Sequence, residues 1–167
     1  EKGKIYGLIG RNGAGKTTTL KTIMGLTPAS KGSITFGGKD VTKKPPYDIA
    51  KLGIGYVPED QGIFAKLTVE ENMKVAIRKE TESVMQKQAY ILDLFPDLKT
   101  FWKKHGGDLS GGQKQMLAMA RAFVNDSKLL LIDEPSKGLA PIVIEKVMEA
   151  ITEMKKHTSI VLVEQNF

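Results

Sequence analysis

The segment KIYGLIGRNGAGKTTTL, residues 4–20, carries the clearest structural signal in this chain of 167 residues. It begins with the apolar run KIYGLIG (4–10), which predicts a β-strand that ends in glycine. It continues into KTTTLKTIMGL (16–26), which predicts a helix that ends at Gly25. The segment between them, GRNGAGKT (10–17), matches the pattern G-x-x-x-x-G-K-[ST]. A strand, a glycine-rich loop and a helix in this order indicate an α/β fold with a phosphate-binding loop.

The residue types of this loop suit the binding of phosphate groups. Gly10, Gly13 and Gly15 allow the backbone to curl until successive N–H groups point at phosphate oxygens, and the following helix adds the positive end of its dipole. Lys16 supplies a positive charge for the β- and γ-phosphates, and the hydroxyl of Thr17 is placed to ligate Mg²⁺. A glycine-rich turn without a ligand is the alternative, but the strand and helix around the loop favour nucleotide binding. We therefore expect the nucleotide to contact Gly10, Arg11, Asn12, Gly13, Ala14, Gly15, Lys16, Thr17 and Thr18.

The rest of the chain predicts one domain that alternates strands and helices at both ends and is helical in the middle. Strands are expected at 52–58, 128–135 and 158–164, a hairpin at 32–41, and helices at 68–80, 81–95, 110–124 and 141–156. The apolar runs 129–132 and 160–163 favour a mostly parallel sheet with helices on both faces. We therefore expect an α/β core at about 1–67 and 125–167, with a helical subdomain at about 68–124.

Composition and charge exclude several classes of protein. No apolar run approaches the roughly 18 residues of a membrane-spanning helix. The chain has no cysteine, which excludes disulfides and thiol chemistry. Its net charge is +6, but the lysines are spread along the chain, so a solvated basic surface is favoured over a nucleic-acid interface. The sequence shows neither an initiator Met nor a signal peptide, and we expect it to be a fragment of a longer protein.

Two adjacent carboxylates end the apolar run LLLIDEP (129–135). Asp133 and Glu134 are expected at the C-terminal edge of the sheet, where parallel sheets bind ligands. Because neighbouring side chains of an extended segment point to opposite sides, the two acids can have different roles. Asp133 suits a Mg²⁺ ligand paired with the phosphate loop, and Glu134 suits a general base that polarises a water molecule aimed at the γ-phosphate. A strand that leaves the core through polar residues is the alternative.

A second glycine-rich segment, LSGGQ (109–113), opens the helix expected at 110–124. Ser110 is a favourable N-cap residue, and Gly111 and Gly112 leave the N–H groups of the first turn uncovered, which again favours an anion. An ordinary helix start is the alternative. One nucleotide hardly needs two such sites in a single chain.

The motifs GRNGAGKTT, LSGGQ and LLLIDEP, in this order, resemble those of the ATP-binding subunits of ABC transporters over essentially the whole chain. The resemblance implies the P-loop NTPase fold, ATP and Mg²⁺ as ligands, and ATP hydrolysis coupled to transport across a membrane. It also implies a second ABC ATPase subunit, identical or paralogous, paired head to tail, so that LSGGQ of one subunit closes over the ATP of the other. The residues implied to contact the γ-phosphate held by the partner are Ser110, Gly111, Gly112 and Gln113.

Three further segments, DEPSKGLAPIVIEKVMEAI (133–151), ILDLFPDLK (91–99) and LVEQN (162–166), are similar to ATPases of importers for branched-chain amino acids and to their urea and amide relatives. This similarity implies a peripheral subunit on the cytoplasmic face of the plasma (inner) membrane. Such a subunit binds integral membrane permease subunits, serves a solute-binding protein and has no nucleic-acid partner. LGIGYVPEDQGIFAKLTVEEN (52–72) is also similar to lipopolysaccharide-export ATPases.

The sequence is also compatible with two functions that do not involve transport. A soluble ABC ATPase acting on ribosomes or DNA is one, although such proteins usually join two modules or carry long insertions. A module that binds ATP without hydrolysing it is the other, although the presence of Glu134 argues against it. The family's adenine-stacking aromatic residue and two further strands precede this region, and family members continue for several more elements. We therefore expect truncation at both ends.

The sequence departs from the general ABC pattern at three positions. Glu59 stands where a Gln usually ligates Mg²⁺ and senses the permease; a carboxylate can also ligate Mg²⁺, but it adds a negative charge near the phosphates. Ala140 stands where an Asp is common. Gln165 stands where the switch His is expected, and we predict that it acts beside Glu134 by hydrogen bonding to the γ-phosphate without an imidazolium charge.

Overall fold

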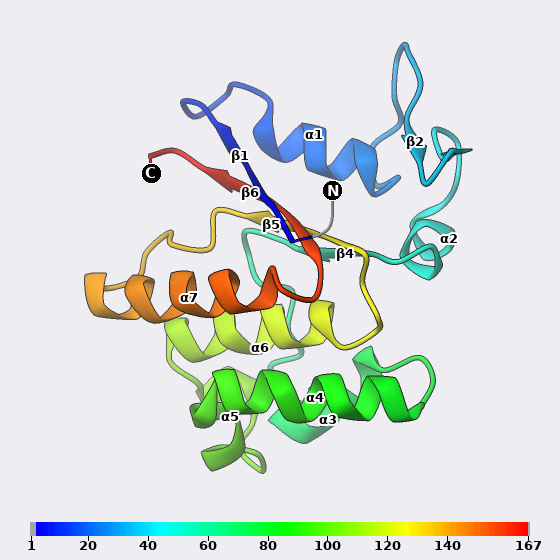
Figure 1. Ribbon diagram of the computed structural model, residues 1–167. Helices are drawn as coiled ribbons and strands as arrows, with labels where there is room; N and C mark the ends of the chain where they lie inside the picture. The colour runs from blue at the N-terminus through cyan, green and yellow to red at the C-terminus, as the bar shows by residue number, and fades with distance from the viewer. Residues whose placement is uncertain (1–2, 167) are drawn as a thin grey trace.

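A four-stranded parallel sheet lies at the centre of the protein (Figure 1), for which the computed structural model describes residues 3–166. The strands are β1 (Ile5–Ile9), β4 (Ile54–Val57), β5 (Leu129–Asp133) and β6 (Ser159–Glu164). Their order in the sheet is β1–β6–β5–β4, and all neighbours are parallel. The predicted α/β architecture with a mostly parallel sheet is confirmed.

The sheet separates two hydrophobic clusters, and β5 contributes to both. Leu131 points into a cluster with helices α1 (Lys16–Ile23) and α2 (Pro46–Lys51). Leu130 and Ile132 point into the larger cluster, with helices α6 (Gly111–Phe123) and α7 (Pro141–Met154). Successive side chains of a strand point to opposite faces, so a strand covered on both sides is apolar at every position. This explains the unbroken run LLLI that precedes the acid pair.

The middle of the chain forms a further layer of helices, which Figure 1 shows on the side of α6 away from the sheet. Met73, Ile91 and Leu98 from this layer are fully buried and belong to the same cluster as α6, α7 and β5. The layer therefore packs on the sheet through α6. Its elements are α3 (Val69–Ala76), α4 (Glu82–Leu94), α5 (Pro96–Thr100) and a 3-10 turn at Gly106–Asp108.

The ends of α3 illustrate what local sequence does and does not determine. Its start has a capping box, in which the Glu71 N–H donates to the Thr68 hydroxyl and the Glu71 carboxylate accepts from the Thr68 N–H. Its end was predicted at residue 80, but the helix ends at Ala76. Asn125, from the loop after α6, donates to the carbonyl of Ala76 at 2.6 Å and accepts from the N–H of Arg78 at 3.1 Å. A distant side chain thus caps this helix.

Three short elements were not predicted from the sequence. They are α2, α5 and the 3-10 turn, none longer than six residues. Pro46 and Pro96 stand at the starts of α2 and α5, where proline is favourable because its missing N–H has no partner in a first turn anyway. The predicted hairpin is present as β2 (Thr35–Phe36) and β3 (Lys39–Asp40). Within the described residues, no helix has both the length and the apolar character needed to cross a membrane.

Candidate nucleotide-binding site

Four strand ends meet at the C-terminal edge of the sheet. β1 leads into the phosphate loop, β4 is followed by Glu59, β5 ends at Asp133 and β6 ends at Glu164. The register places Ile9 beside Glu164 and Asp133 beside Val163, so the ends of β1, β5 and β6 are level. Parallel sheets bind ligands at this edge. The fold therefore brings the predicted loop and acids into one place.

The phosphate loop turns through two glycines with left-handed backbone. Gly13 has a φ of 82° and Gly15 a φ of 88°, values that residues with a Cβ rarely adopt. Gly15 is also the N-cap of α1, whose first N–H groups lack partners within the helix. Lys16 folds back over the loop, where Nζ donates to the carbonyls of Gly10 and, at 2.9 Å, of Arg11. The loop thus offers N–H donors and a nearly buried ammonium to an anion.

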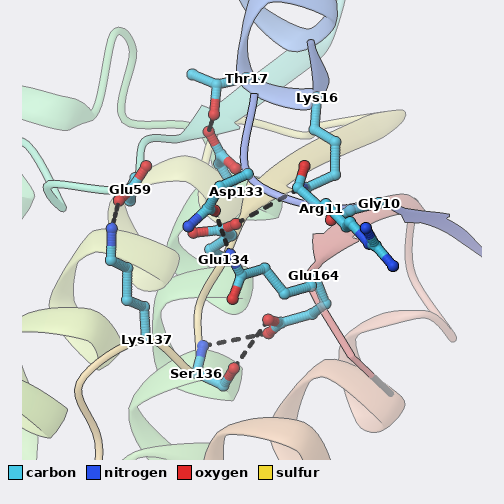
Figure 2. Close-up of polar contacts among 12 residues, drawn as sticks. Gly10, Arg11, Lys16, Thr17, Glu59, Asp133, Glu134, Ser136, Lys137 and Glu164 are labelled. Carbon is cyan, nitrogen blue, oxygen red and sulfur yellow. Dashed lines mark hydrogen bonds and ion pairs between the residues drawn. The ribbon is translucent and has the colours of Figure 1, made fainter. Parts of the chain in front are cut away.

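Thr17 and Asp133 join the loop to the sheet (Figure 2). The Thr17 hydroxyl donates to Oδ2 of Asp133 at 2.7 Å. Asp133 is fully buried, and its other oxygen, Oδ1, has no hydrogen-bond partner among the described residues. Burial raises the pKa of Asp133 above its ordinary value, and the hydrogen bond from Thr17 opposes that shift. An unpartnered carboxylate oxygen beside a hydroxyl oxygen is a donor set that suits Mg²⁺.

Glu134 has an uncommon backbone conformation, with a φ of 44°. Its N–H donates to the carbonyl of Val163 at 2.8 Å, which holds this turn against β6. Its carboxylate lies 3.9 Å from Nζ of Lys16 and is 9% exposed. The left-handed conformation turns Glu134 toward the phosphate loop, whereas Asp133 faces Thr17. Such strained residues occur most often at functional sites.

Glu59 forms an ion pair with Lys137, from the turn after the acid pair (Figure 2). The hydrogen bond to Glu59, together with the charge of Glu59, raises the pKa of Lys137. The sequence pattern included Lys137 only as part of the segment DEPSKGLAPIVIEKVMEAI (133–151). Its proximity to Glu59, 78 positions earlier, follows from the pairing of β4 with β5 and has no local sequence signal.

Glu164 holds the turn that follows Glu134. Its carboxylate accepts from the Ser136 N–H at 3.2 Å and from the Ser136 hydroxyl at 2.8 Å (Figure 2). Burial raises the pKa of Glu164, while the hydrogen bonds from Ser136 lower it. The sequence showed that β6 ends in polar residues, and the structure shows that the first of them is a buried acceptor.

Gln165 lies beside the phosphate loop. Its Nε2 donates to Oδ1 of Asn12, and its side chain is exposed. Together with Asn12 and Glu134 it lines a cavity of about 210 Å³. The structure thus places Gln165 beside the phosphate loop, and its contact with the terminal phosphate stays a prediction.

Two larger cavities adjoin this one. The cavity over the phosphate loop, about 310 Å³, is lined by Asn12, Gly13, Gly15, Lys16, Thr17, Thr18, Glu59, Glu134 and Lys137. Another of about 620 Å³ lies beside it and shares Thr17, Glu59 and Lys137. Tyr56 lines the second cavity; burial, with smaller contributions from Asp133, Asp60 and Glu59, raises its pKa to about 12.

The segment LSGGQ lies apart from these cavities. None of the residues 110–113 lines any of the three. Ser110 is the N-cap of α6, as predicted, and forms a capping box with Gln113. Gln113 also donates to Asp97 at 3.3 Å. A Cβ on Gly112 would lie 2.5 Å from Cγ1 of Val143, so this glycine allows α6 to approach α7 closely.

Comparisons with known proteins identify the family in which this arrangement occurs. The family model described as ABC transporter matches residues 1–137. The chain is 41% identical to the probable branched-chain amino acid transport ATP-binding protein LivF of Archaeoglobus fulgidus, over 99% of this chain and 72% of that protein. The chain belongs to the ABC transporter family. It is an ATP-binding subunit of this family and an ATPase.

Other ABC proteins show the same similarity. The high-affinity branched-chain amino acid transport ATP-binding protein BraG of Pseudomonas aeruginosa is 42% identical, over 99% of this chain and 72% of that protein. A solved nucleotide-free ATP-binding cassette from an ABC transporter superposes with a TM-score of 0.83 at 27% identity, covering 99% of this chain and 72% of that one. The resemblance to ABC transporter ATP-binding subunits is therefore confirmed, and so is the fold class.

Proposed function

We propose that this ABC ATPase powers an importer for branched-chain amino acids or related small polar solutes. The observation that carries the proposal is its identity of 41% and 42% with two proteins named for branched-chain amino acid transport, over 99% of its length. On this proposal the chain is a peripheral subunit on the cytoplasmic face of the plasma (inner) membrane, bound to integral permease subunits that receive solute from a binding protein.

Each residue of the site has a proposed role in hydrolysis. The loop residues 10–18 hold the phosphates of ATP, with Lys16 on the β- and γ-phosphates. Glu134 accepts a proton from the water molecule that attacks the γ-phosphorus, and ADP leaves. Gln165 donates a hydrogen bond to a γ-phosphate oxygen. The contact of Lys16 with both the loop and Glu134 supports this arrangement, because it puts the acid near the place that the terminal phosphate would occupy.

The donor set at Thr17 and Asp133 fits Mg²⁺, with Glu59 as a further ligand. When bound, Mg²⁺ would neutralise negative charge on the β- and γ-phosphates. Asp133 keeps one oxygen on the Thr17 hydroxyl and leaves Oδ1 unpartnered, so it is already oriented toward a cation. No group of three or more His, Cys, Asp or Glu side chains that could hold a metal occurs in residues 3–166. Mg²⁺ is usually bound through one or two carboxylates and takes its other ligands from phosphates and water.

The segment 110–113 is proposed to meet ATP held by a second ABC ATPase subunit, identical or paralogous, in a head-to-tail pair. Ser110 and Gly111 are exposed at the start of α6. The capping box uses the N–H groups of Ser110 and Gln113, which leaves those of Gly111 and Gly112 for an anion. Their position apart from the cavities of their own chain supports this role. The helical layer at about 68–124 is proposed as the subdomain that moves with this segment, while about 1–67 and 125–167 form the core.

The test is transport in a reconstituted complex. The protein is purified with the permease encoded beside it, and the complex is reconstituted into proteoliposomes. The fraction of complexes in each orientation is measured, and ATP, Mg²⁺ and a solute-binding protein are supplied. We expect ATP-dependent accumulation of labelled leucine, isoleucine or valine. The matched control is Glu134→Gln, which should bind ATP but abolish accumulation.

Lipopolysaccharide export is the second candidate. The chain is 35% identical to the lipopolysaccharide export system ATP-binding protein LptB of Haemophilus influenzae, over 91% of this chain and 64% of that protein. Proteoliposomes that hold lipopolysaccharide distinguish the two. ATP-dependent extraction of lipopolysaccharide without amino-acid uptake would assign export and overturn the proposed importer.

A further inference from the structure

Lys137 is a second lysine at the nucleotide cavity. Figure 2 shows Lys16 and Lys137 on opposite sides of Asp133 and Glu134. Both lysines line the cavity of about 310 Å³ over the phosphate loop. Lys16 is nearly buried and held by carbonyl groups of the loop, whereas the Lys137 side chain is 63% exposed. The cavity is therefore lined by one buried lysine, Lys16, and one exposed lysine, Lys137.

The partner of Lys137 is a carboxylate that the phosphates would repel. Glu59 is paired with Lys137 and lines the same cavity. An exposed ion pair of this kind contributes little to stability, because water screens the charges and two long side chains lose freedom. Exchanging such a partner therefore costs little. Bringing the phosphates of ATP beside Glu59 without a compensating cation would cost more.

The backbone of Lys137 is anchored near the acid pair. Its N–H donates to the carbonyl of Glu134 at 3.2 Å, and the preceding Ser136 is held by Glu164. The Cα of Lys137 thus keeps its place relative to Glu134, and only the flexible four-carbon side chain has to move.

We propose that Lys137 exchanges partners when ATP binds: its ammonium leaves Glu59 and binds the γ-phosphate of the ATP in its own chain. The exchange would leave the Glu59 carboxylate available as a Mg²⁺ ligand, which rests on the proposed role of Glu59. Lys137 is then a residue that distinguishes ATP from ADP. It also compensates the negative charge that Glu59 adds to the site.

The first test compares a triphosphate with a diphosphate. Affinities for a non-hydrolysable ATP analogue and for ADP are measured by calorimetry, both with Mg²⁺, for wild type and Lys137→Met. We expect the analogue to bind about tenfold more weakly to the variant, as for the loss of one charged hydrogen bond, and ADP to bind unchanged. Equal weakening of both nucleotides, or of neither, would overturn the inference.

Lys103→Met is the matched control. Lys103 is exposed and paired with one carboxylate, Glu70, but neither residue lines a cavity of the site. Lys103→Met should leave the affinities for the ATP analogue and for ADP unchanged. Lys16→Met should weaken both nucleotides. If it does so while Lys137→Met has no effect, the nucleotide site stands and the role of Lys137 fails; if wild type binds neither nucleotide, the site itself fails.

The second test measures the exchange directly and does not depend on Mg²⁺. Affinity for the ATP analogue is measured in EDTA for wild type, Glu59→Gln, Lys137→Met and the double variant. If Lys137 leaves Glu59 for the phosphate, Glu59→Gln should improve affinity more when Lys137 is present, because it removes both the repulsion and the competing partner. If Lys137 stays on Glu59, the gain should be larger when Lys137 is absent, because only then is the carboxylate uncompensated.

Discussion

Glu164 binds Ser136 through both carboxylate oxygens, one on the backbone N–H at 3.2 Å and one on the hydroxyl at 2.8 Å. The contact ties the end of β6 to the turn between Glu134 and Lys137. Glu164 is only 4% exposed, so its charge is desolvated where two other carboxylates, Asp133 and Glu134, are near. The bond between β6 and this turn therefore depends on the ionisation of a buried group.

Glu164→Gln should make stability less dependent on pH. Burial raises the pKa of Glu164 above its ordinary value of 4.5, so the folded protein binds this proton more tightly than the unfolded chain does. A group with a raised pKa stabilises the fold most below pH 4.5, and this contribution is lost as the pH rises through the raised value. Urea unfolding measured from pH 4.5 to neutrality should show a smaller loss of unfolding free energy for the variant. Asp133, whose pKa is also raised, contributes to the pH dependence of both proteins and serves as the internal control. Parallel curves of unfolding free energy against pH for wild type and variant would contradict the expectation.

Glu134→Gly should gain stability and lose activity. The residue has a φ of 44°, which glycine adopts without the steric cost of a Cβ, on the order of 1 kcal/mol. Glycine also removes the carboxylate. Urea unfolding and ATP hydrolysis measure the two effects.

Glu134→Gln is the matched variant, because it keeps the backbone strain and removes only the base. Its unfolding free energy should stay close to that of wild type. Its hydrolysis rate should fall about 10²–10⁴-fold while ATP binding remains. Normal hydrolysis by either variant would show that Glu134 is not the base.

Gly112→Ala should destabilise the protein by about 1–3 kcal/mol, although alanine favours helices over glycine. Its Cβ would lie 2.5 Å from Cγ1 of Val143, so α6 and α7 would have to move apart. Gly111→Ala is the control, since its Cβ would meet its nearest atom, Cδ2 of Leu139, at 3.6 Å. Thermal unfolding of both variants checks the difference. Val143→Ala should restore stability to Gly112→Ala, and failure to do so would place the clash elsewhere.

Gln165→His should change how ATP hydrolysis depends on pH. Gln165 reaches Asn12 in the phosphate loop through an amide that does not titrate near neutral pH. Histidine has an ordinary pKa of about 6.5, so the variant should gain a step in its rate near that pH. Steady-state hydrolysis across the neutral range is the measurement. A profile identical to that of wild type would show that this side chain does not contact the reacting phosphate.

The helices and strands with a regular spacing of apolar residues could be predicted from the sequence, because burial of one or both faces imposes that spacing. β5 is apolar at all four positions before Asp133 since both faces are covered. The short helices α2 and α5 have too few residues for a period, so their prolines were the only signal. The end of α3 could not be predicted, because the Asn125 side chain that caps it lies far along the chain.

The candidate site likewise contains residues that could be predicted from the sequence and residues that could not. The loop, Asp133 and Glu134 were identified because their residue types are specific and adjacent in sequence, and the structure places them together; their chemical roles stay predictions. The partners that orient them were not identified. The pairing of Lys137 with Glu59 and of Ser136 with Glu164 arises from strand register, and register is a property of the assembled sheet.

The place of β6 in the sheet has a consequence for synthesis. β6 is the last strand of the described chain, yet it lies between β1 and β5 and is the only strand there that pairs with β1. During synthesis, β1 therefore cannot pair with β6 until residues 159–164 have emerged. A nascent chain that stalls before this point exposes two apolar strand edges, which invites binding by chaperones or aggregation. Within residues 3–166, the sheet edge that carries the nucleotide site is thus continuous only once β6 is in place.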